Sequence, residues 1–366
     1  MPGKRIAILG TRGIPARYGG FETFAEELGA RLVERGFRVT VVCEKVRGAS
    51  QPPTFRGIDL AYVPAPRLGP LTTIAFDLMS LWRVRKGYDV VYMLGYGASL
   101  FCFIPRLGGA EVWINMDGIE WLRSKWSWAA RAYLRLIETV ATWTPNRIIA
   151  DADAIRSHLQ SRHRRLPECT VVPYGSDLVT AAPPEELLAE WGLKVGEYYI
   201  LVCRLEPENH VLDIVEGYAA SSSTFPLVVL GDHKLNTPYV RLLQSVADPR
   251  VRLIGTVYDK VRLRALRFHA RAYLHGHSVG GTNPSLLEAM GSGNVVIAHD
   301  NVFNREVAAD AALYFRNARD IPGILEILEA DSGRRQRMRE VARHRVESIY
   351  NWRMIADRYE QLLGSR

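Results

Sequence analysis

The chain has 366 residues, of which 48% are hydrophobic and 23% are charged, and its formal net charge is +8. This composition excludes an intrinsically disordered chain, and the length suits two globular domains that each bury a core. The positive charge favours an anionic partner: nucleic acid, an acidic membrane surface or a phosphorylated substrate. The first residues show no signal-peptide pattern, and the longest uncharged run, residues 90–104, is shorter than the roughly 20 residues that span a bilayer. We therefore expect a cytoplasmic protein.

The first half of the chain alternates short apolar runs with amphipathic stretches. We predict a helix over residues 21–35, with Phe24, Leu28 and Leu32 on one face, because these residues recur at helical spacing. Strands that alternate with helices imply a mostly parallel, doubly wound sheet. The predicted strands are residues 5–10, 38–43, 90–93, 112–116, 147–150 and 170–173.

A second series of strands and helices follows the Pro-containing segment 181–184, which we take as the linker. The sequence therefore predicts two Rossmann-like domains, residues 1–182 and 183–366. The predicted strands of the second domain are residues 199–203, 227–230, 251–254, 272–275 and 295–298.

The glycine-containing loop after the first strand, residues 10–20, allows a dinucleotide-binding interpretation. Glu44 ends the second strand, where such folds place a ribose-binding acid. However, the loop has no G-x-G-x-x-G pattern and is long for the tight turn that this fingerprint needs. We therefore disfavour a nicotinamide cofactor.

The segment from residue 121 to 135 contains Arg123, Lys125, Arg131 and Arg135 interleaved with tryptophans, and it contains no acid. Such a basic aromatic stretch suits an anionic membrane interface. The alternative is a helix that packs its tryptophans inward and leaves its arginines solvated. Nucleic acid is disfavoured because no recognition motif accompanies the charge.

Two sets of residues bear on a metal site. The four cysteines (Cys43, Cys102, Cys169 and Cys203) form no C-x-x-C pair, which argues against zinc and against disulfides. Asp151 and Asp153 have the D-x-D spacing of a metal site, but they follow a strand and open a helix, so Asp153 is equally suited to an N-terminal cap. We expect no metal and no cofactor.

The most informative segment is residues 275–300, which read as a loop, a helix and a buried strand. A glycine-containing loop that leads into a helix N-terminus is suited to bind an anion, and Pro284 fits the first helical turn. One turn later, Glu288 is placed to accept hydrogen bonds from ribose hydroxyls. The alternative is an ordinary α/β loop with a solvated glutamate. Anion site and diol acceptor together indicate a nucleotide sugar.

The segment HSVGGTNPSLLEAM resembles the donor-site motif of GT-B retaining glycosyltransferases. Within that group it resembles the motif of a branch of bacterial rhamnosyltransferases. Glu288 matches the ribose-contacting glutamate of that motif. Gly280 stands where many relatives have a second glutamate, which usually contacts sugar hydroxyls. The segment CRLEPEN resembles the family's G-R-L-x-x-x-K-G, so Arg204 matches the diphosphate-clamping arginine and Asn209 stands at the lysine position.

The resemblance implies an α/β fold of GT-B type, with two doubly wound Rossmann-like domains facing across a cleft. It also implies that the last helix, about residues 350–364, returns to the first domain. The residues expected to bind the donor are Gly19, Gly20, Arg204, Asn209, Gly281, Thr282, Asn283 and Glu288. The residues expected at the acceptor are Arg17, Tyr18 and Glu22.

Three further residues are assigned to catalysis by the resemblance. Asp117 matches the position where many relatives have a histidine beside the transferred sugar, although a solvated Asp-Gly turn is the simpler interpretation. Tyr174 replaces the asparagine of V-P-N-G-V-D and is expected to face the cleft. Asp153 is kept as a candidate catalytic carboxylate.

The resemblance further implies a metal-independent retaining rhamnosyltransferase at the cytoplasmic face of the cell membrane. It would move rhamnose from dTDP-rhamnose to a lipid-diphosphate-linked saccharide in surface-polysaccharide assembly. One alternative transfers another sugar, such as GlcNAc or a hexose, from a UDP or GDP donor. The other is a non-catalytic membrane-associated homologue.

Overall fold

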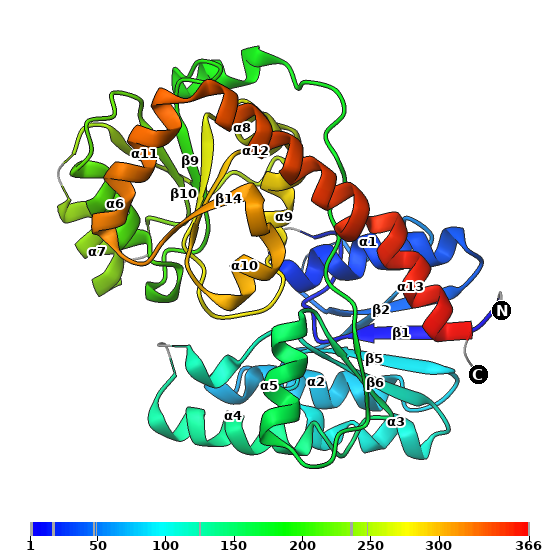
Figure 1. Cartoon of the computed structure of the whole chain (residues 1–366). Helices are drawn as coiled ribbons and strands as arrows, with labels where there is room; N and C mark the ends of the chain where they lie inside the picture. The colour runs from blue at the N-terminus through cyan, green and yellow to red at the C-terminus, as the bar shows by residue number, and fades with distance from the viewer. Residues whose placement is uncertain are drawn as a thin grey trace. The chain divides into compact units, whose positions relative to one another are not determined.

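The computed structural model describes residues 3–16, 19–46, 48, 50–123, 126–234, 237–246 and 248–364. It consists of two compact units: the chain up to Tyr174 with the segment from Trp352 onward, and the segment Gly175–Asn351 (Figure 1). The chain thus enters the second unit eight residues before the predicted boundary at residue 182. The predicted linker lies inside the second unit, where His269 Nε2 is 2.8 Å from the carbonyl oxygen of Pro183.

The first unit contains an eight-stranded sheet in which only the β3–β4 pair is antiparallel. Because helices cover both faces of the sheet, all five residues of the central strand β5 are buried, and each of them is apolar or aromatic. In sheet order, the strands are β3 (Thr54–Phe55), β4 (Ile58–Val63), β2 (Arg38–Glu44), β1 (Arg5–Leu9), β5 (Val90–Leu94), β6 (Glu111–Met116), β7 (Arg147–Ala150) and β8 (Glu168–Val171).

Figure 1 shows α1 (Gly20–Glu34) and α13 (Trp352–Gly364) together on one face of this sheet, and α2, α3 and α4 on the other. The predicted apolar face of α1 is buried. Helix α13 is held by a 2.8 Å hydrogen bond between the hydroxyls of Tyr92 and Tyr359 and by a 2.6 Å ion pair between Arg35 and Asp357. The other elements of this unit are η1 (Gly69–Leu71), α2 (Thr72–Arg83), η2 (Ser99–Phe101), α3 (Phe103–Leu107), η3 (Glu120–Leu122), α4 (Trp128–Val140) and α5 (Asp153–Arg162).

The second unit contains a fully parallel six-stranded sheet. Alternate residues of β9 enter two different apolar cores, Tyr199 and Leu201 on one face and Ile200 on the other. In sheet order, the strands are β11 (Val251–Gly255), β10 (Leu227–Leu230), β9 (Tyr199–Val202), β12 (Ala272–His275), β13 (Val296–His299) and β14 (Ala312–Phe315). The helices are η4 (Glu185–Trp191), η5 (Pro207–Asn209), α6 (Val211–Ala219), α7 (Pro238–Ser245), α8 (Lys260–Phe268), α9 (Pro284–Gly291), α10 (Val302–Ala308), η6 (Ala309–Ala311), η7 (Ala318–Asp320), α11 (Ile321–Ala330), α12 (Ser332–Arg345) and η8 (Val346–Tyr350).

Each sheet has one point where the strand order reverses. In the first unit it lies between β1 and β5, and in the second unit between β9 and β12. Open α/β sheets bind ligands just outside the carboxyl ends of the strands at such a point. The loops that follow β1 and β5, and those that follow β9 and β12, are therefore the candidate sites.

The predicted doubly wound, mostly parallel sheets are confirmed. Strand β8 begins two residues earlier than the predicted strand 170–173. The sequence analysis did not predict β3, β4 or β14.

Candidate functional site

The loops after β9 and β12 are joined into one structure by a short hydrogen-bond chain. Asn209 Nδ2 donates to the carbonyl oxygen of Arg204 at 2.6 Å, and Asn209 Oδ1 lies 2.7 Å from His277 Nδ1. The backbone N–H of Ser278 donates to the carbonyl of Glu208 at 3.0 Å. Asn209 is 3% exposed. The structure therefore gives Asn209 a positioning role between the two loops, and its predicted contact with the donor stays a prediction.

Two glycines allow the chain to approach closely at this edge. A Cβ atom on Gly276 would lie 1.9 Å from the carbonyl oxygen of Asn209, and one on Gly231 would lie 2.6 Å from that of Cys203. Contacts below 3.0 Å are not tolerated by a real Cβ atom. The sequence analysis missed both residues, although each directly follows an apolar strand, where an isolated glycine signals a close backbone approach.

The loop that leads into α9 is buried and ends in a capped helix N-terminus. Gly280 has φ +138°, a backbone conformation that side chains with a Cβ rarely adopt. Thr282 is 3% exposed, and Asn283 caps the helix by accepting a 2.9 Å hydrogen bond from the N–H of Ser285. Pro284 occupies the first turn of α9, as predicted. Gly281 is buried in the same loop. The N-terminus of α9 therefore brings partial positive charge to the carboxyl edge of β12.

Glu288 is oriented by an arginine that the sequence analysis missed. Arg267, on α8, lies with Nη1 2.6 Å from Glu288 Oε2, and its Nη2 donates to Ser285 Oγ at 3.1 Å. The Arg267 side chain is 7% exposed, whereas that of Glu288 is 39% exposed. A carboxylate held on one side by a buried guanidinium keeps a fixed direction while it remains accessible to a ligand. No local pattern around residue 267 could have predicted this pair, because α8 and α9 meet only in the fold.

Arg204 follows β9 at the same edge of the sheet, and its side chain is 41% exposed, 3.5 Å from Glu206. Cys203 precedes it, and burial raises the pKa of that thiol to about 12, so it stays neutral. Burial lowers the pKa of His275 to about 3. Burial, followed by the charge of His210, lowers the pKa of His299 to about 4. Both imidazoles are neutral at pH 7. The positive charge available to an anion at this edge of the sheet therefore comes from Arg204 and the N-terminus of α9.

The corresponding edge of the first unit is shaped by the loop after β1. A Cβ atom on Gly10 would lie 2.0 Å from the carbonyl oxygen of Leu94, at the end of β5. Gly19 has φ +129° and lies against the carboxylate of Glu22, which accepts a 3.1 Å hydrogen bond from the N–H of Arg12. Gly20 begins α1. The structure thus uses Glu22 to fix the loop.

Arg17 and Tyr18, which were predicted to contact the acceptor, lie outside the described residues. The acceptor prediction for the first unit therefore rests on the sequence, with Gly19, Gly20 and Glu22 at the same loop.

Tyr174, which was predicted to face the cleft, is buried. Its ring packs on Phe24 with centroids 5.0 Å apart, and its hydroxyl donates to Asn115 Oδ1 at 3.4 Å. Burial, and then the charges of Asp117 and Asp151, raise its pKa well above the usual value. Tyr174 is therefore a neutral packing residue. Asp117 follows β6 at the carboxyl edge of the sheet and is half-buried, so it stays a candidate.

The two aspartates of the D-x-D pattern point to different surroundings. Asp151 is fully buried, whereas the side chain of Asp153 is 59% exposed and pairs with Arg156 on the same helix. The N-cap of α5 is Ala152, so the predicted capping role of Asp153 is wrong. The described residues contain no group of three or more His, Cys, Asp or Glu side chains able to hold a metal ion.

Comparisons with known proteins resolve the fold. Residues 3–177 match a family described as "Domain of unknown function (DUF1972)". A search of curated proteins gave no match. Sucrose-phosphate synthase from Thermosynechococcus elongatus superposes with a TM-score of 0.84 at 16% identity, covering 99% of this chain and 100% of that chain. HepE from Anabaena in complex with UDP-glucose gives a TM-score of 0.77 at 15% identity, with 99% and 100% covered.

A third solved structure, described as trehalose-6-phosphate from E. coli bound with UDP-2-fluoro glucose, gives a TM-score of 0.74 at 12% identity. The match covers 98% of this chain and 99% of that chain. These neighbours are glycosyltransferases of one architecture, and they match along the full chain. The fold is GT-B. The GT-B fold places two Rossmann-like units in one chain.

Proposed function

We propose that the protein is a glycosyltransferase whose second unit binds the diphosphate and ribose of a nucleotide-sugar donor. The observation that supports this most is the set of groups gathered at the β9–β12 reversal point. Arg204 and the N-terminus of α9 supply positive charge, and Glu288, oriented by Arg267, supplies an acceptor for ribose hydroxyls. The solved neighbours include HepE in complex with UDP and with UDP-glucose, and an E. coli protein bound with UDP-2-fluoro glucose.

The chemistry that suits this edge is electrostatic. As the bond from the sugar to the diphosphate breaks, negative charge grows on the leaving phosphate, and a preorganised arginine and helix N-terminus stabilise it. Front-face attack lets the departing phosphate accept the proton of the acceptor hydroxyl, so no protein nucleophile is needed. Asp117 is the half-buried carboxylate retained as a candidate beside the transferred sugar.

For the donor we propose dTDP-rhamnose, as the motif resemblance implies. Gly280 supports a difference from hexose-transferring relatives, because its φ of +138° would strain a glutamate at this position. The alternative donors, in which GlcNAc or a hexose is linked to UDP or GDP, are to be tested in parallel. A protein that binds a nucleotide sugar but never turns it over would be the non-catalytic homologue.

The donor assignment is tested by Arg204→Ala and Glu288→Ala, with nucleoside diphosphate affinity measured by calorimetry. Each variant is expected to lose about 1.5–3 kcal/mol, the contribution of a charge-assisted hydrogen bond. Arg319→Ala and Glu326→Ala, at exposed positions of the same unit, are matched controls and should bind as the wild type does. Unchanged affinity in both site variants would remove the basis of the assignment.

For the acceptor we propose a lipid-diphosphate-linked saccharide, reached from the cytoplasmic face of a membrane. The first unit carries a surface suited to this task on α2, α3 and α4, which Figure 1 shows on one face of its sheet. Every exposed charged side chain of these three helices is an arginine: Arg83, Arg106, Arg131 and Arg135. Large apolar side chains are exposed beside them: Met79 38%, Trp82 58%, Phe103 46%, Leu107 83%, Trp128 84% and Leu136 63%.

This apolar–basic face, defined by those ten residues, includes Trp128, Arg131 and Arg135 of the predicted membrane segment 121–135. Arg123 is 8% exposed and pairs with Glu120 at 2.7 Å, so it faces inward. Trp121 is half-buried, and the guanidinium of Arg135 lies 4.4 Å from its ring centre. Lys125 lies outside the described residues. None of the described helices has the length and apolar character needed to cross a bilayer.

The membrane proposal is tested with the triple variant Trp128→Gln, Leu136→Gln and Arg131→Gln in sedimentation with anionic liposomes. Loss of one cation near an anionic surface removes about 1 kcal/mol, and removal of two apolar groups weakens binding further. The control is Tyr258→Gln, Val261→Gln and Arg264→Gln, an equally exposed set in the second unit. Equal sedimentation of the two variants would show that the face does not bind membranes.

A further inference from the structure

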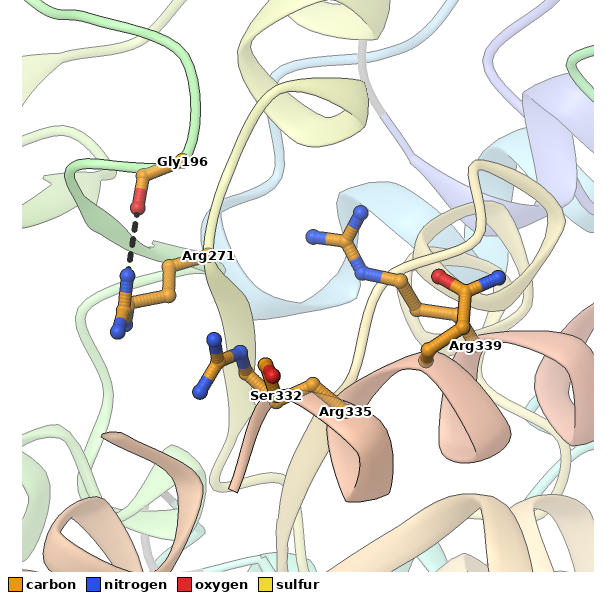
Figure 2. A pocket seen from close by; sticks show the side chains of 6 residues that line it. Gly196, Arg271, Ser332, Arg335 and Arg339 are labelled. Atoms are coloured by element: carbon orange, nitrogen blue, oxygen red, sulfur yellow. Dashed lines mark hydrogen bonds between the residues drawn. The ribbon is translucent and has the colours of Figure 1, made fainter. Parts of the chain in front are cut away.

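A pocket of about 250 Å³ lies at the amino-terminal edge of the second sheet, lined by three arginines with Gly196, Ser332 and Gln336. Arg271 directly precedes β12, whereas Arg335 and Arg339 lie on α12 (Figure 2). Because the strands are parallel, this edge is opposite the carboxyl edge that carries Arg204 and Glu288. Strands of four residues separate the two edges by about 13 Å.

Backbone carbonyl groups, which carry no net charge, hold the three guanidinium groups in place. Arg271 Nη1 donates to the carbonyl oxygen of Gly196 at 3.1 Å, drawn as a dashed line in Figure 2. Arg335 Nη1 donates to the carbonyl of Glu329 at 3.2 Å, and Arg339 Nη2 donates to that of Ala270 at 3.1 Å. These bonds fix the direction of each group without neutralising it.

Among the described residues, the three guanidinium groups form no ion pair, although the carboxylates of Asp331 and Glu329 act on Arg335 from a greater distance. Within the described part of the chain, none of the three arginines has a carboxylate within the 4.0 Å of an ion pair. The Nε of Arg271 is buried and has no hydrogen-bond partner. The α12 N-terminus begins at Ser332 and is capped by Asp331, whose carboxylate accepts a 2.7 Å hydrogen bond from the N–H of Arg334.

The three charges also oppose one another. Burial, and then the charges of Arg335 and Arg271, lower the pKa of Arg339. Burial, and then Arg271, lower that of Arg335, although Asp331 and Glu329 act in the opposite direction. Positive groups that converge on a cavity and destabilise one another are stabilised when an anion enters. A planar guanidinium fork matches the oxygens of a phosphate group.

We propose that this pocket is a second anion site, which binds a phosphate or diphosphate group independently of the donor edge. The group belongs either to a small phosphorylated metabolite or to a phospholipid headgroup. The proposal does not depend on the glycosyltransferase assignment, because it rests on residues at the other edge of the sheet.

The test uses the full chain carrying Arg204→Ala, so that a diphosphate bound at the donor edge does not obscure the result. Calorimetry with inorganic pyrophosphate should give saturable binding, and pyrophosphate should raise Tm. Adding Arg335→Gln or Arg339→Gln should weaken that affinity about tenfold to a hundredfold, the effect of one charge-assisted hydrogen bond. Arg334→Gln, a neighbour on α12 that does not line the pocket, is the control.

A merely structural role for these arginines predicts a different pattern. If they only hold the backbone, Arg335→Gln and Arg339→Gln would lower Tm without ligand, and pyrophosphate would bind the parent and the variants alike. Our proposal predicts that Tm without ligand does not fall in these variants, because removing one of three mutually repelling charges relieves repulsion in the free protein. It also predicts that pyrophosphate binds the variants more weakly than the parent. That structural pattern, or no binding of any probe, would overturn the proposal.

Vesicles of phosphatidylglycerol and phosphatidylcholine separate the two sources of the phosphate group. Saturable binding of free pyrophosphate that depends on Arg335 supports a soluble metabolite. Vesicle binding that falls in Arg335→Gln, with no binding of free pyrophosphate, supports a lipid headgroup.

Discussion

Glu138 on α4 is a buried carboxylate that four side chains of the first unit contact. Its side chain is 1% exposed, and its partners lie on η3, on α5 and in the residue that follows α5. The distances from its oxygens are 2.8 Å to Trp121 Nε1, 3.0 Å to Arg162 Nε, 3.2 Å to His163 Nε2 and 3.4 Å to His158 Nε2. Replacing Glu138 by glutamine keeps the shape and removes the charge.

The magnitude follows from the pKa of this carboxyl. Burial raises it, but hydrogen bonds from His158, Trp121 and His163 outweigh burial and bring the pKa from 4.5 to about 2. A difference of about 2.5 units corresponds to about 3 kcal/mol of stability at pH 7. Because the folded pKa is the lower one, this stability is fully present above pH 4.5 and is lost as the pH falls toward 2.

We therefore expect Glu138→Gln to lower the unfolding free energy by about 3 kcal/mol at pH 7, which is roughly 6–12 °C in Tm for a unit of this size. The difference between wild type and variant should shrink to about half at pH 3. Thermal melts followed by circular dichroism at pH 7, 5 and 3 measure both effects. Glu34→Gln, an exposed position on α1, should leave Tm unchanged. A loss below about 1 kcal/mol, or a difference that does not vary with pH, would refute the reasoning.

Three other predictions follow from the described geometry. Arg267→Met should leave Glu288 without its orienting partner and weaken nucleoside diphosphate binding by about 1–2 kcal/mol in calorimetry, whereas Arg264→Met on the same helix should not. Gly10→Ala should lower the unfolding free energy by about 2–4 kcal/mol, because the added Cβ would lie 2.0 Å from the Leu94 carbonyl oxygen. The control Gly97→Ala should be tolerated, because a Cβ added there would meet no atom of the described residues within 4 Å beyond its chain neighbours. Glycosyl transfer should persist in excess EDTA, since Arg204 and the N-terminus of α9 supply the positive charge that stabilises the leaving diphosphate. Glycosyl transfer that strictly requires Mg²⁺ and is lost in Asp153→Asn would contradict this.

The sequence predicts the fold well where strands are apolar and regularly spaced. Strand β7 and strand β12 have the predicted bounds, because each contains three consecutive apolar or aromatic residues in a short run between helical patterns. Strand β4 lies near the edge of the sheet and contains Asp59. It was missed because this polar residue interrupts the run of apolar residues that would predict a buried strand. The unit boundary was misplaced because prolines at residues 183 and 184 resemble a linker, although hydrogen bonds tie that segment to the second unit.

The candidate site was predicted in its local parts and missed in its long-range parts. Gly280, Asn283 and Pro284 are neighbours in sequence, so turn and capping chemistry identify them. Arg267 and Gly276 act through residues that only the fold brings near, and no spacing rule reaches them. The same limit explains why Tyr174 and Arg123 were expected at an exposed surface. Tyr174 is buried against Phe24, and Arg123 is buried beside the carboxylate of Glu120.

The first unit is assembled from two segments of the chain, and this has a consequence for how it folds during synthesis. Its residues up to Tyr174 emerge from the ribosome first, but α13 is made only after the whole second unit. Until then Phe24 and Tyr92 lack the rings of Trp352 and Tyr359 that cover them. The nascent first unit therefore has an exposed aromatic surface for most of translation, whereas the second unit is continuous and can fold on its own. Contacts of such long sequence separation form late, so closure by α13 is expected to be the final step.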